Sequence, residues 1–335
     1  MQIPDAVKIL KLRGSYGIVG NDKIGGERWL YITEFTQGGT DLGYGGGYYF
    51  GKTSSGTSGA KGFNESRVGN EYVTWEKAKK LNVGFDASFF DNNVLNFTVD
   101  YFYERRDNIL TAPGTINDYV GITNISPRNS GKVMNQGVEF EVTVNKQLNR
   151  DFAFFATLQG TYAKNKVLEN DQPTPQFAYQ DLRGYEIGYA LGYKSDGFFK
   201  DWNDINNSAT QSFGPVIPGD IKYVDTNKDG VVDPSDRVPI KVSSVPKMVT
   251  GLSFGFNYKQ FDFSMMMNAA LGSSAKCWAY PSSIINLDRW SPDNLDAKMP
   301  VAHSTSNNTQ VSDYNLMSTD YLKIRNMITM PEYKY

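Results

Sequence analysis

Runs of about ten residues in which apolar and polar side chains alternate limit the folds open to this chain more than any other feature. Residues 252–259, LSFGFNYK, and residues 261–272, FDFSMMMNAALG, are the clearest examples. Successive side chains of a β-strand point to opposite faces, so each run has one apolar face and one polar face. Strands of about 9–11 residues with this alternation are typical of transmembrane β-barrels. The chain is therefore predicted to be all-β and to form a portion of an antiparallel transmembrane barrel.

The composition of the chain fits a portion of such a barrel and excludes several other classes of protein. The chain has 335 residues, of which 40% are hydrophobic, yet its mean hydropathy is −0.46. No stretch approaches the roughly 18 apolar residues of a spanning helix, which excludes a helical membrane protein. Aromatic residues make up 14% of the chain, and Tyr and Trp suit both a bilayer interface and the stacking of sugar rings. The net charge of −2 gives no indication of nucleic-acid binding.

The residues that usually carry covalent or metal chemistry are scarce. Cys277 is the only cysteine and His303 the only histidine, which argues against a disulfide framework, a zinc site and a Cys–His catalytic pair. With one histidine the chain has no HExxH motif, and no GxSxG nucleophile elbow or phosphate loop stands out. Glu139 and Glu141 are two residues apart and so share a face, but polar positions on a barrel strand explain them better than a glycosidase acid/base pair. We therefore predict that the chain is not an enzyme.

The connections between the alternating runs differ strongly in length. Short polar turns near 92, 149 and 260 join neighbouring runs into hairpins, whereas long loops follow 36, 107, 166, 200 and 272. Residues 29–35 suggest a further strand after a turn at Gly20-Asn21, and Tyr48 to Phe50 a short strand within a Gly/Ser-rich loop over 38–62. Short turns at one end and long loops at the other are typical of outer-membrane barrels. A soluble β-sandwich is the structural alternative.

An acidic loop over 225–236, DTNKDGVVDPSD, has the spacing of a calcium-binding loop. Its predicted ligands are Asp225, Asn227, Asp229, the carbonyl oxygen of Val231, Asp233 and Asp236. Position 12 is Asp236 instead of Glu, and no flanking helices are expected, so the ion would be structural. The alternative is a solvated turn in which the Asp and Asn side chains cap their own backbone.

Aromatic residues in the expected loops are candidates for contact with sugars. They are Trp202, Trp278, Tyr280, Tyr179 and Tyr185, whose rings are suited to stacking on pyranose faces. The same residues would also suit the packing of loops against each other or a contact with a partner protein. The first three are the candidates for substrate binding.

Several stretches resemble, in order, the SusC-type TonB-dependent outer-membrane transporters. They are KLRGSYG from Lys11 to Gly17, NEYVTWEKAKKLNVG from Asn70 to Gly84, NSGKVMNQGVEFE from Asn129 to Glu141, residues 188–199, GDIKYVDTNKDGVVDPSDR from Gly219 to Arg237, residues 246–262, residues 289–300 and DYLKIRN from Asp320 to Asn326. Each stretch alone is a weak pattern. Their collinear order across nearly the whole chain makes the resemblance specific.

The resemblance implies the C-terminal part of such a barrel, with about ten to twelve of the roughly 22 strands these transporters use. Residues 1–335 have no counterpart of the plug domain, the TonB box or the last strands, and MQIPDAVKIL is not a signal peptide. We therefore expect the chain to be part of a longer protein, because alone it leaves two open sheet edges in the bilayer.

By resemblance, the whole protein lies in the outer-membrane lipid and imports glycans or, in some members, peptides. A SusD-type surface lipoprotein would cover the long loops, and TonB would act through the missing N-terminal region. Two alternatives remain at this point. One is a siderophore- or cobalamin-type TonB-dependent receptor, against which the GDIKYVDTNKDG stretch argues. The other is a soluble extracellular carbohydrate-binding sandwich with a structural calcium ion.

Overall fold

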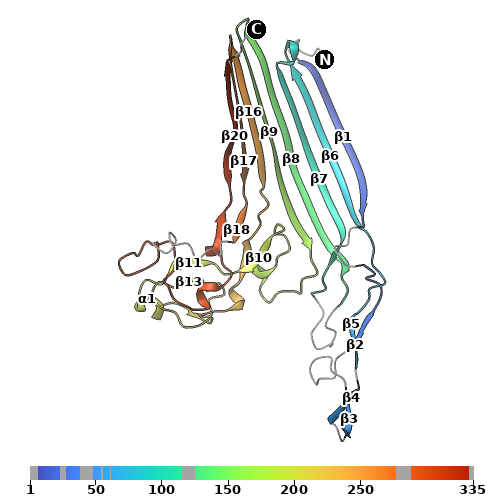
Figure 1. The fold of residues 1–335 in the computed structure, drawn as a ribbon, viewed down its shortest axis with the longest axis vertical. Helices are drawn as coiled ribbons and strands as arrows, with labels where there is room; N and C mark the ends of the chain where they lie inside the picture. The colour runs from blue at the N-terminus through green and yellow to red at the C-terminus, as the bar shows by residue number, and fades with distance from the viewer. Residues whose placement is uncertain are drawn as a thin grey trace.

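Eight long strands form one antiparallel sheet in the computed structural model, which describes residues 7–22, 28–37, 48–53, 56–60, 62–114, 125–276 and 288–331. Their order in the sheet is β1-β6-β7-β8-β9-β16-β17-β20, so each long strand pairs with the next long strand along the chain (Figure 1). Their bounds are β1 Val7–Asn21, β6 Glu76–Phe89, β7 Leu95–Thr111, β8 Arg128–Asn149, β9 Phe152–Glu169, β16 Met248–Tyr258, β17 Phe261–Leu271 and β20 Tyr321–Pro331.

The register of the sheet separates the alternating residues into two faces. One row across all eight strands is apolar: Leu10, Ala87, Phe97, Val142, Leu158, Leu252, Met267 and Ile324. The neighbouring row consists of Lys11, Asp86, Thr98, Glu141, Gln159, Gly251, Asn268 and Lys323. We call these the apolar face and the polar face. The period of two in the sequence therefore persists across the whole sheet.

Short turns close one end of the sheet, where the sequence predicts them. A 3-10 turn, η1 (Asp91–Asn93), joins β6 to β7, and Asn92 and Asn93 adopt positive φ values of 59° and 51°. Asn tolerates this left-handed conformation better than most residues. Residues 150–151 and 259–260 make the other two short turns. All three predicted hairpins are confirmed.

Long connections leave the opposite end (Figure 1). Between β1 and β6 they contain two small hairpins, β2 (Glu34–Gln37) with β5 (Phe63–Arg67) and β3 (Tyr48–Thr53) with β4 (Gly56–Ala60). The short strand predicted around residue 48 is thus confirmed. The prediction of a strand over 29–35 is wrong in extent, because the chain turns between Trp29 and Ile32, whose N–H donates to the Trp29 carbonyl at 2.9 Å. The turn predicted at Gly20-Asn21 is also wrong, since β1 continues through Asn21.

A compact group of loops, residues 170–247 and 288–320, lies beyond the ends of β9, β16, β17 and β20, and we call it the outer module (Figure 1). Its short strands are β10 Tyr189–Gly192, β11 Ser195–Phe198, β12 Thr210–Gln211, β13 Ile221–Tyr223, β14 Val231–Val232, β15 Val238–Lys241 and β19 Leu316–Ser318, which pairs with β18 Ser274–Lys276. Its helical turns are α1 Trp202–Asn206, η3 Ala178–Gln180, η4 Pro234–Asp236, η5 Asn307–Thr309 and η6 Asp313–Asn315. No helix of the described residues is long and apolar enough to span a membrane.

The outer module has its own apolar core. Tyr193, Ile221, Tyr223 and Val232 are at most 2% exposed and pack together, and the Phe213 ring packs tilted against Tyr193 and edge-on against Tyr223. Three of the four core residues come from the 219–237 stretch. That stretch therefore builds the interior of the module as well as its acidic loop.

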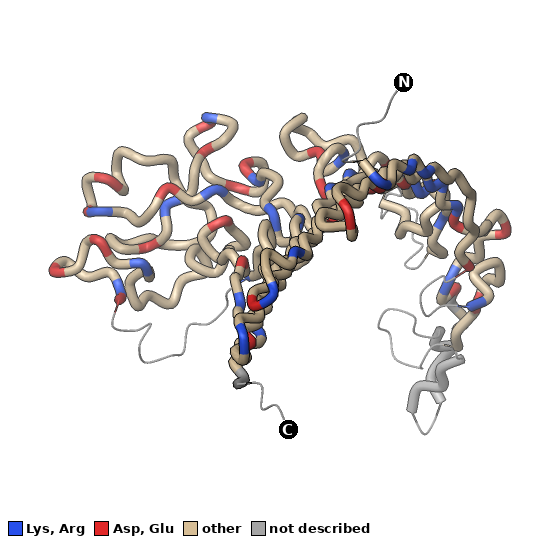
Figure 2. Tube along the Cα trace, turned by 90° about the horizontal axis from the view of Figure 1, so that it is seen from above, with Lys and Arg blue, Asp and Glu red and all other residues tan. Residues whose placement is uncertain are grey.

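The long sheet curves into an arc when viewed along its strands (Figure 2). Within the described residues, β1 and β20 each pair with a long strand on one side only, so the arc is an open portion of a barrel. Eight strands contribute to it, fewer than the ten to twelve expected, because short runs such as β2 pair inside the connections. The two-sheet sandwich is not observed, since all eight long strands share one sheet.

Candidate functional site

Arg13 joins three strands on the polar face. Its Nε and Nη2 lie 2.8 and 2.9 Å from the two carboxylate oxygens of Asp86, and Nη2 also lies 2.8 Å from Oδ2 of Asp100. Gly84 stands between Arg13 and Asp100 in the register, and a β-carbon there would lie 2.3 Å from Oδ1 of Asp100. The absence of a side chain at this position therefore lets the guanidinium reach across β6.

A second group of charges lies nearer the outer ends of β6 and β7. Nη1 of Arg106 is 3.3 Å from Oε1 of Glu76, and its Nε also contacts Glu104, which pairs with Lys80 at 3.5 Å. Arg106, Glu76 and Glu104 border a cavity of about 360 Å³. The rest of its lining is Ile109, Val133, Asn135, Ala163, Asn165, Glu186, Ile187, Ser243, Val245, Pro246 and Lys247. Lys247 and Glu186, both in this lining, form an ion pair of 2.8 Å.

Glu139 and Glu141 lie on the polar face, as the sequence indicates. They stand opposite Asp100 and Thr98 of β7 and line a shallow depression of about 530 Å³. This surface carries carboxylates and hydroxyl groups along several strands. It can hold water and polar solutes against the sheet.

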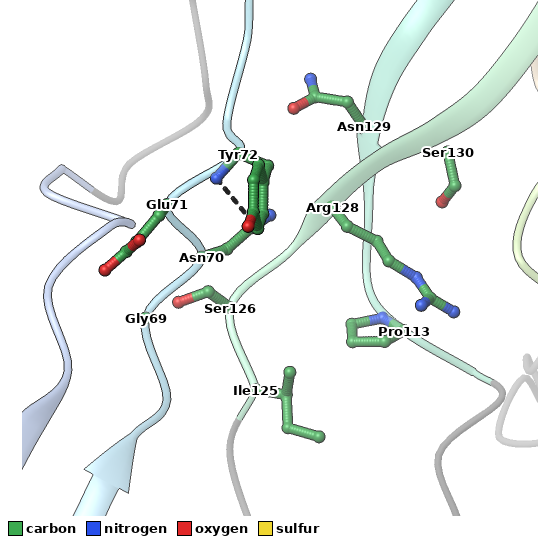
Figure 3. A pocket seen from close by; sticks show the side chains of 10 residues that line it. All are labelled: Gly69, Asn70, Glu71, Tyr72, Pro113, Ile125, Ser126, Arg128, Asn129 and Ser130. Carbon is green, nitrogen blue, oxygen red and sulfur yellow. Dashed lines mark hydrogen bonds between the residues drawn. The ribbon is translucent and has the colours of Figure 1, made fainter.

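A further cavity, of about 660 Å³, lies where β7 and β8 meet the chain that leads into β6, and we call it the rim cavity (Figure 3). It is lined by Gly69, Asn70, Glu71, Tyr72, Pro113, Ile125, Ser126, Arg128, Asn129 and Ser130. Tyr72 stands on one side of it, and Arg128 and Pro113 on the other (Figure 3). None of these residues was expected to form a site from the sequence.

Asp220 connects the two segments of the outer module. Its carboxylate is fully buried and accepts hydrogen bonds from the amide of Asn308 at 2.7 Å and from the backbone N–H of Ile217 at 2.8 Å. Nδ1 of His303 lies 2.8 Å from the same carboxylate. The only histidine therefore has a structural partner. Sequence reasoning gave Asp220 no role, although it belongs to the resembling GDIKY stretch.

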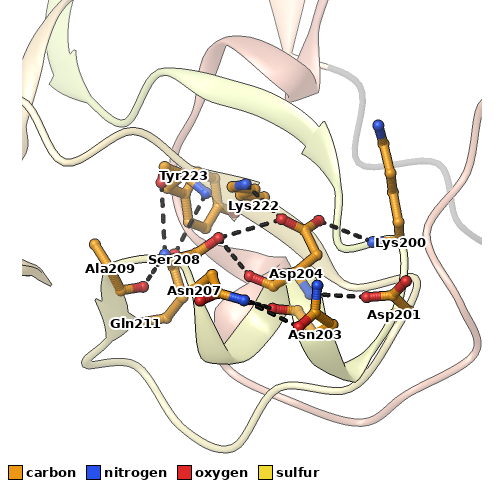
Figure 4. Close-up of polar contacts among 10 residues, drawn as sticks. All are labelled: Lys200, Asp201, Asn203, Asp204, Asn207, Ser208, Ala209, Gln211, Lys222 and Tyr223. Atoms are coloured by element: carbon orange, nitrogen blue, oxygen red, sulfur yellow. Dashed lines mark hydrogen bonds and ion pairs between the residues drawn. The ribbon is translucent and has the colours of Figure 1, made fainter.

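Asp204 organises the surface of the module around α1 (Figure 4). Nζ of Lys222 lies 2.8 Å from Oδ1 of Asp204, and the backbone N–H of Lys200 donates to Oδ2 at 3.0 Å. The hydrogen bond from Lys222 lowers the pKa of the Asp204 carboxyl below its ordinary value, against the opposing effect of burial. At the start of the helix, Asp201 accepts a hydrogen bond from the N–H of Asp204, which caps α1.

The acidic loop caps its own backbone. Asp225 accepts hydrogen bonds from the N–H groups of Lys228 and Gly230, and Asn227 and Asp229 accept from the residues two positions later. Asp236 is fully buried, and both of its oxygens accept backbone N–H groups within the loop. Asp233 forms a reciprocal capping box with Asp236. Val231, whose carbonyl is the remaining predicted ligand, lies in β14 opposite Thr210.

These oxygens leave the calcium prediction open. Among the described residues, no three His, Cys, Asp or Glu side chains form a group placed to hold a metal ion. Each carboxylate oxygen that accepts one hydrogen bond retains further acceptor capacity. Burial and the negative charge of Asp236 raise the pKa of the nearby Tyr179 phenol. Calcium binding by the loop stays a prediction.

The three loop aromatics that the structure describes have different surroundings. Trp202 begins α1 and is 59% exposed, whereas Tyr179 donates its hydroxyl to the carbonyl of Ser235 at 2.7 Å and so packs the module. Tyr185 lies beside Tyr189, with ring centroids 5.1 Å apart. Trp278 and Tyr280 lie outside the described residues, as does Cys277.

Comparison with known proteins agrees with this fold. The family model described as "TonB dependent receptor-like, beta-barrel" matches residues 31–321. TonB-dependent receptor P26 of Formosa agariphila is 26% identical over 326 residues, which cover 91% of this chain and 31% of the relative. TonB-dependent receptor SusC of Bacteroides thetaiotaomicron is 24% identical over 341 residues, covering 95% of this chain and 31% of the relative.

Solved structures show the same fold. The RagAB peptide importer in its open-open state matches with a TM-score of 0.66 and 18% identity, over 98% of this chain and 34% of that chain. The chain thus spans about a third of the length of the curated relatives and solved chains it matches. Taken with the two-faced antiparallel sheet, the family match over most of the sequence shows that the chain belongs to the TonB-dependent receptor-like β-barrel family.

Proposed function

We propose that this chain forms part of the barrel of a SusC-type TonB-dependent importer in the outer membrane. The observation that carries the proposal is the sheet itself, in which an unbroken apolar row lies beside a polar row across all eight strands. An apolar face suits lipid, and a polar face suits a water-filled lumen. The charged groups around Arg13 and Arg106 then line the transport path.

The lengths of the strands support this placement. A bilayer requires about 9–11 residues of a tilted strand. β16 and β17 have 11 residues each, whereas β8 has 22. We therefore place the short turns at the periplasmic side, and the outer ends of β7, β8 and β9, with the outer module, beyond the outer leaflet. The module would meet a SusD-type lipoprotein, and TonB would act on another part of the whole protein.

Glycans are the proposed cargo. The relative SusC and the exposed aromatic side chains of the outer loops support this choice, because aromatic rings stack on sugars. Peptides are the second candidate, since the similar solved structures are described as a peptide importer. Neither cargo changes the role proposed for the sheet.

Deletion of the gene in its host, with complementation, tests the proposal. We expect loss of uptake of fluorescent neutral oligosaccharides, restored by the intact gene and abolished again when TonB is removed. Uptake that survives TonB removal would contradict an energised importer. Loss of peptide uptake with normal oligosaccharide uptake would replace the glycan cargo by the peptide cargo.

We propose in addition that Ca²⁺ binds the acidic loop and orders the outer module. The predicted ligands are the side chains of Asp225, Asn227, Asp229, Asp233 and Asp236 with the Val231 carbonyl. Calorimetric titration of the purified whole protein with CaCl₂ should give one saturable site. Asp229→Asn retains an oxygen for the Val231 N–H but removes a charge, so it should weaken binding without unfolding the loop. An identical titration for this variant would contradict the site.

A further inference from the structure

We infer that the outer part of the apolar face is a docking site for the phosphate groups of glycolipid in the outer leaflet. This inference rests on the proposed function, which turns the apolar face toward lipid, and it adds a partner to that function. The site is a group of cationic side chains on β6, β7 and β9, which we call the outer basic patch. Its members are Lys77, Lys79, Arg105, Lys164 and Lys166.

The register of the sheet places the outer basic patch on the apolar face. One row across β6, β7, β8 and β9 consists of Lys79, Arg105, Met134 and Lys166. Each of these residues is an even number of positions from its strand's member of the apolar row described above, and no register shift lies between the two rows. Because side chains alternate along a strand, both rows share one face.

The ion pairs of β6 and β7 separate the two faces at this height. Nζ of Lys79 and Nε of Arg105 lie 3.3 and 3.0 Å from the carboxylate of Asp107. Lys80, the next residue of β6, instead contacts Glu104 at 3.5 Å on the polar face. The patch is therefore distinct from the charged groups that border the polar face.

The position of the patch along the strands matches the outer edge of the hydrocarbon. Phe89 is the apolar-face residue of β6 nearest the short turn, and Lys79 lies ten residues away from it. Ten residues rise about 33 Å along a strand, or about 25 Å along the bilayer normal at a tilt of about 40°. The apolar band of an outer-membrane barrel is also about 25 Å tall. The cations therefore lie at the level of the lipid headgroups.

Tyrosines lie between the patch and the apolar band. Tyr16 and Tyr103 belong to the row directly inward of Lys79, and Tyr101 and Tyr162 belong to the row after that. Tyrosine is enriched at membrane interfaces, where its ring contacts lipid and its hydroxyl reaches water. The order of apolar residues, tyrosines and cations along these strands is the order expected from hydrocarbon to headgroup.

The patch has an excess of positive charge. Lys77, Lys164 and Lys166 are exposed and form no ion pair or hydrogen bond with the residues that the structure describes. Asp107 is the one carboxylate in the rows of the patch, and two of the cations share it. These five cations against one carboxylate make the patch an attractive surface for anions.

The acidic residues next to the patch are matched by other cations. Glu169, at the end of β9, stands opposite Lys132 of β8. In the segment that follows β9, each carboxylate has its own cation, in the pairs Asp171–Arg128, Asp181–Arg183 and Glu186–Lys247. The charge of the patch is therefore left for a partner outside the described residues.

A phosphate group suits this arrangement. Neighbouring strands are about 4.8 Å apart, so the cations extend across about 14 Å from β6 to β9. Arg105 directs Nε to Asp107, which leaves its Nη donors for a phosphate, and the lysines bind phosphate as point charges. Clusters of Lys and Arg at a membrane surface attract anionic headgroups. Lipid is favoured over an acidic protein because the patch lies directly beyond the apolar band on the same face.

The test is a titration of the whole protein, purified in detergent, with fluorescent lipid A that carries its phosphates. The same lipid A after removal of the phosphates is titrated in parallel. We expect saturable binding of the phosphorylated form, which weakens as the salt concentration rises, and binding of the dephosphorylated form that is weaker on the order of tenfold or more.

Three lysines without described partners provide the variant. The triple substitution Lys77→Gln, Lys164→Gln and Lys166→Gln should weaken binding of phosphorylated lipid A on the order of a hundredfold, at about fivefold for each lysine. Lys164→Arg keeps the charge and should stay within about twofold of the wild type. Heat-modifiable migration on gels should show an unchanged folded fraction, since no described contact is removed.

Lys146→Gln is the matched control for the single substitution Lys164→Gln. Lys146 is also an exposed lysine on the apolar face, but it lies near the short turns, opposite Phe154. Lys164→Gln should weaken binding about fivefold, whereas Lys146→Gln should bind phosphorylated lipid A as the wild type does. Equal effects of the two substitutions would overturn the assignment to the outer basic patch.

The remaining outcomes separate lipid from other partners. Equal binding of both forms of lipid A by the wild type, or equal binding by the triple variant and the wild type, would overturn the inference. Complete displacement of lipid A by inorganic phosphate would overturn the assignment to lipid in favour of free phosphate. If the triple variant binds lipid A normally but loses a co-purifying surface lipoprotein, the patch serves a protein partner and the inference is wrong.

An uptake assay separates this inference from the proposed function. Normal TonB-dependent oligosaccharide uptake by a wild type that shows no preference for phosphorylated lipid A would overturn the inference alone. Absence of oligosaccharide uptake by a wild type that binds phosphorylated lipid A would overturn the proposed cargo and leave the docking site in place.

Discussion

Gly219 shows how one residue without a side chain determines packing in the outer module. Its φ is +91°, and an added β-carbon would lie 2.3 Å from Cε3 of Trp290. Gly219→Ala should therefore lower the free energy of unfolding of the module by about 2–4 kcal/mol through backbone strain and overpacking. The measurement is the urea concentration at which protease cleaves the module in the whole protein.

Gly197→Ala is the matched control for that substitution. Gly197 also has a positive φ, +78°, but an added β-carbon would meet nothing within 4 Å. It should therefore show only the cost of backbone strain, about 1–2 kcal/mol. Equal losses for the two variants would mean that the contact with Trp290 has no effect.

Asp204 makes the stability of the module depend on pH. Because its folded pKa is lowered, mainly by Lys222, the carboxylate stabilises the fold at neutral pH. That contribution is present above the unfolded pKa and disappears as the pH falls through the folded pKa, so it is lost below about pH 4. Asp204→Asn should be less stable by about 1–2 kcal/mol at pH 7 and should match the wild type at low pH. Protease resistance measured from pH 7 to pH 3 gives the stability of the variant and of the wild type at each pH. A difference in stability that does not change with pH would contradict the role of the Asp204 charge.

At the scale of elements, Asp220 couples segments that are far apart in the sequence. Its carboxylate reaches both His303 and Asn308 from the 217–223 stretch. Asp220→Ala should destabilise the module by about 2–4 kcal/mol, because it leaves buried donors without partners. Protease sites in 170–247 and 288–320 should become accessible together, whereas Asp196→Ala, on the exposed surface of β11, should change neither. Cleavage confined to one segment would contradict the coupling.

The elements that the sequence predicts well are those determined locally. The hairpin β6–β7 follows from alternating runs on both sides of Asp91-Asn92-Asn93, and the structure confirms it. The role of Asp220 could not be predicted, because its partners lie 83 and 88 residues away and share no periodicity with it. The rim cavity was missed for the same reason, since Tyr72 and Ser126 come together only when β6, β7 and β8 pair.

The acidic loop shows a further limit of sequence reasoning at this scale. The same Asp and Asn spacing that predicts calcium ligands also places acceptors opposite the N–H groups of the turn, as Asp225 does for Gly230. The backbone is thus ordered by its own side chains. Spacing alone does not distinguish a capped turn from a loaded site.

At the scale of the whole molecule, the two faces of the sheet should tolerate charge very differently. Leu252 lies on the apolar face and its neighbour Ser253 on the polar face. Leu252→Arg should reduce the stability of the membrane-inserted whole protein by about 2–4 kcal/mol, whereas Ser253→Arg should cost well under half of that. Heat-modifiable migration on gels, compared between the two variants, measures the folded fraction. Equal loss for both would contradict the assignment of the apolar face to lipid.

The outer module also affects the order in which the molecule assembles. β9 and β16 are neighbours in the sheet, yet the whole segment between Glu169 and Met248 separates them in the chain. Joining the ends of a long flexible loop carries an entropic cost that delays pairing. A segment with its own core holds its two ends closer together than a flexible loop of the same length, which lowers this cost. We therefore expect the collapse of this surface segment to bring β16 to the growing sheet, which is the action of an intramolecular chaperone.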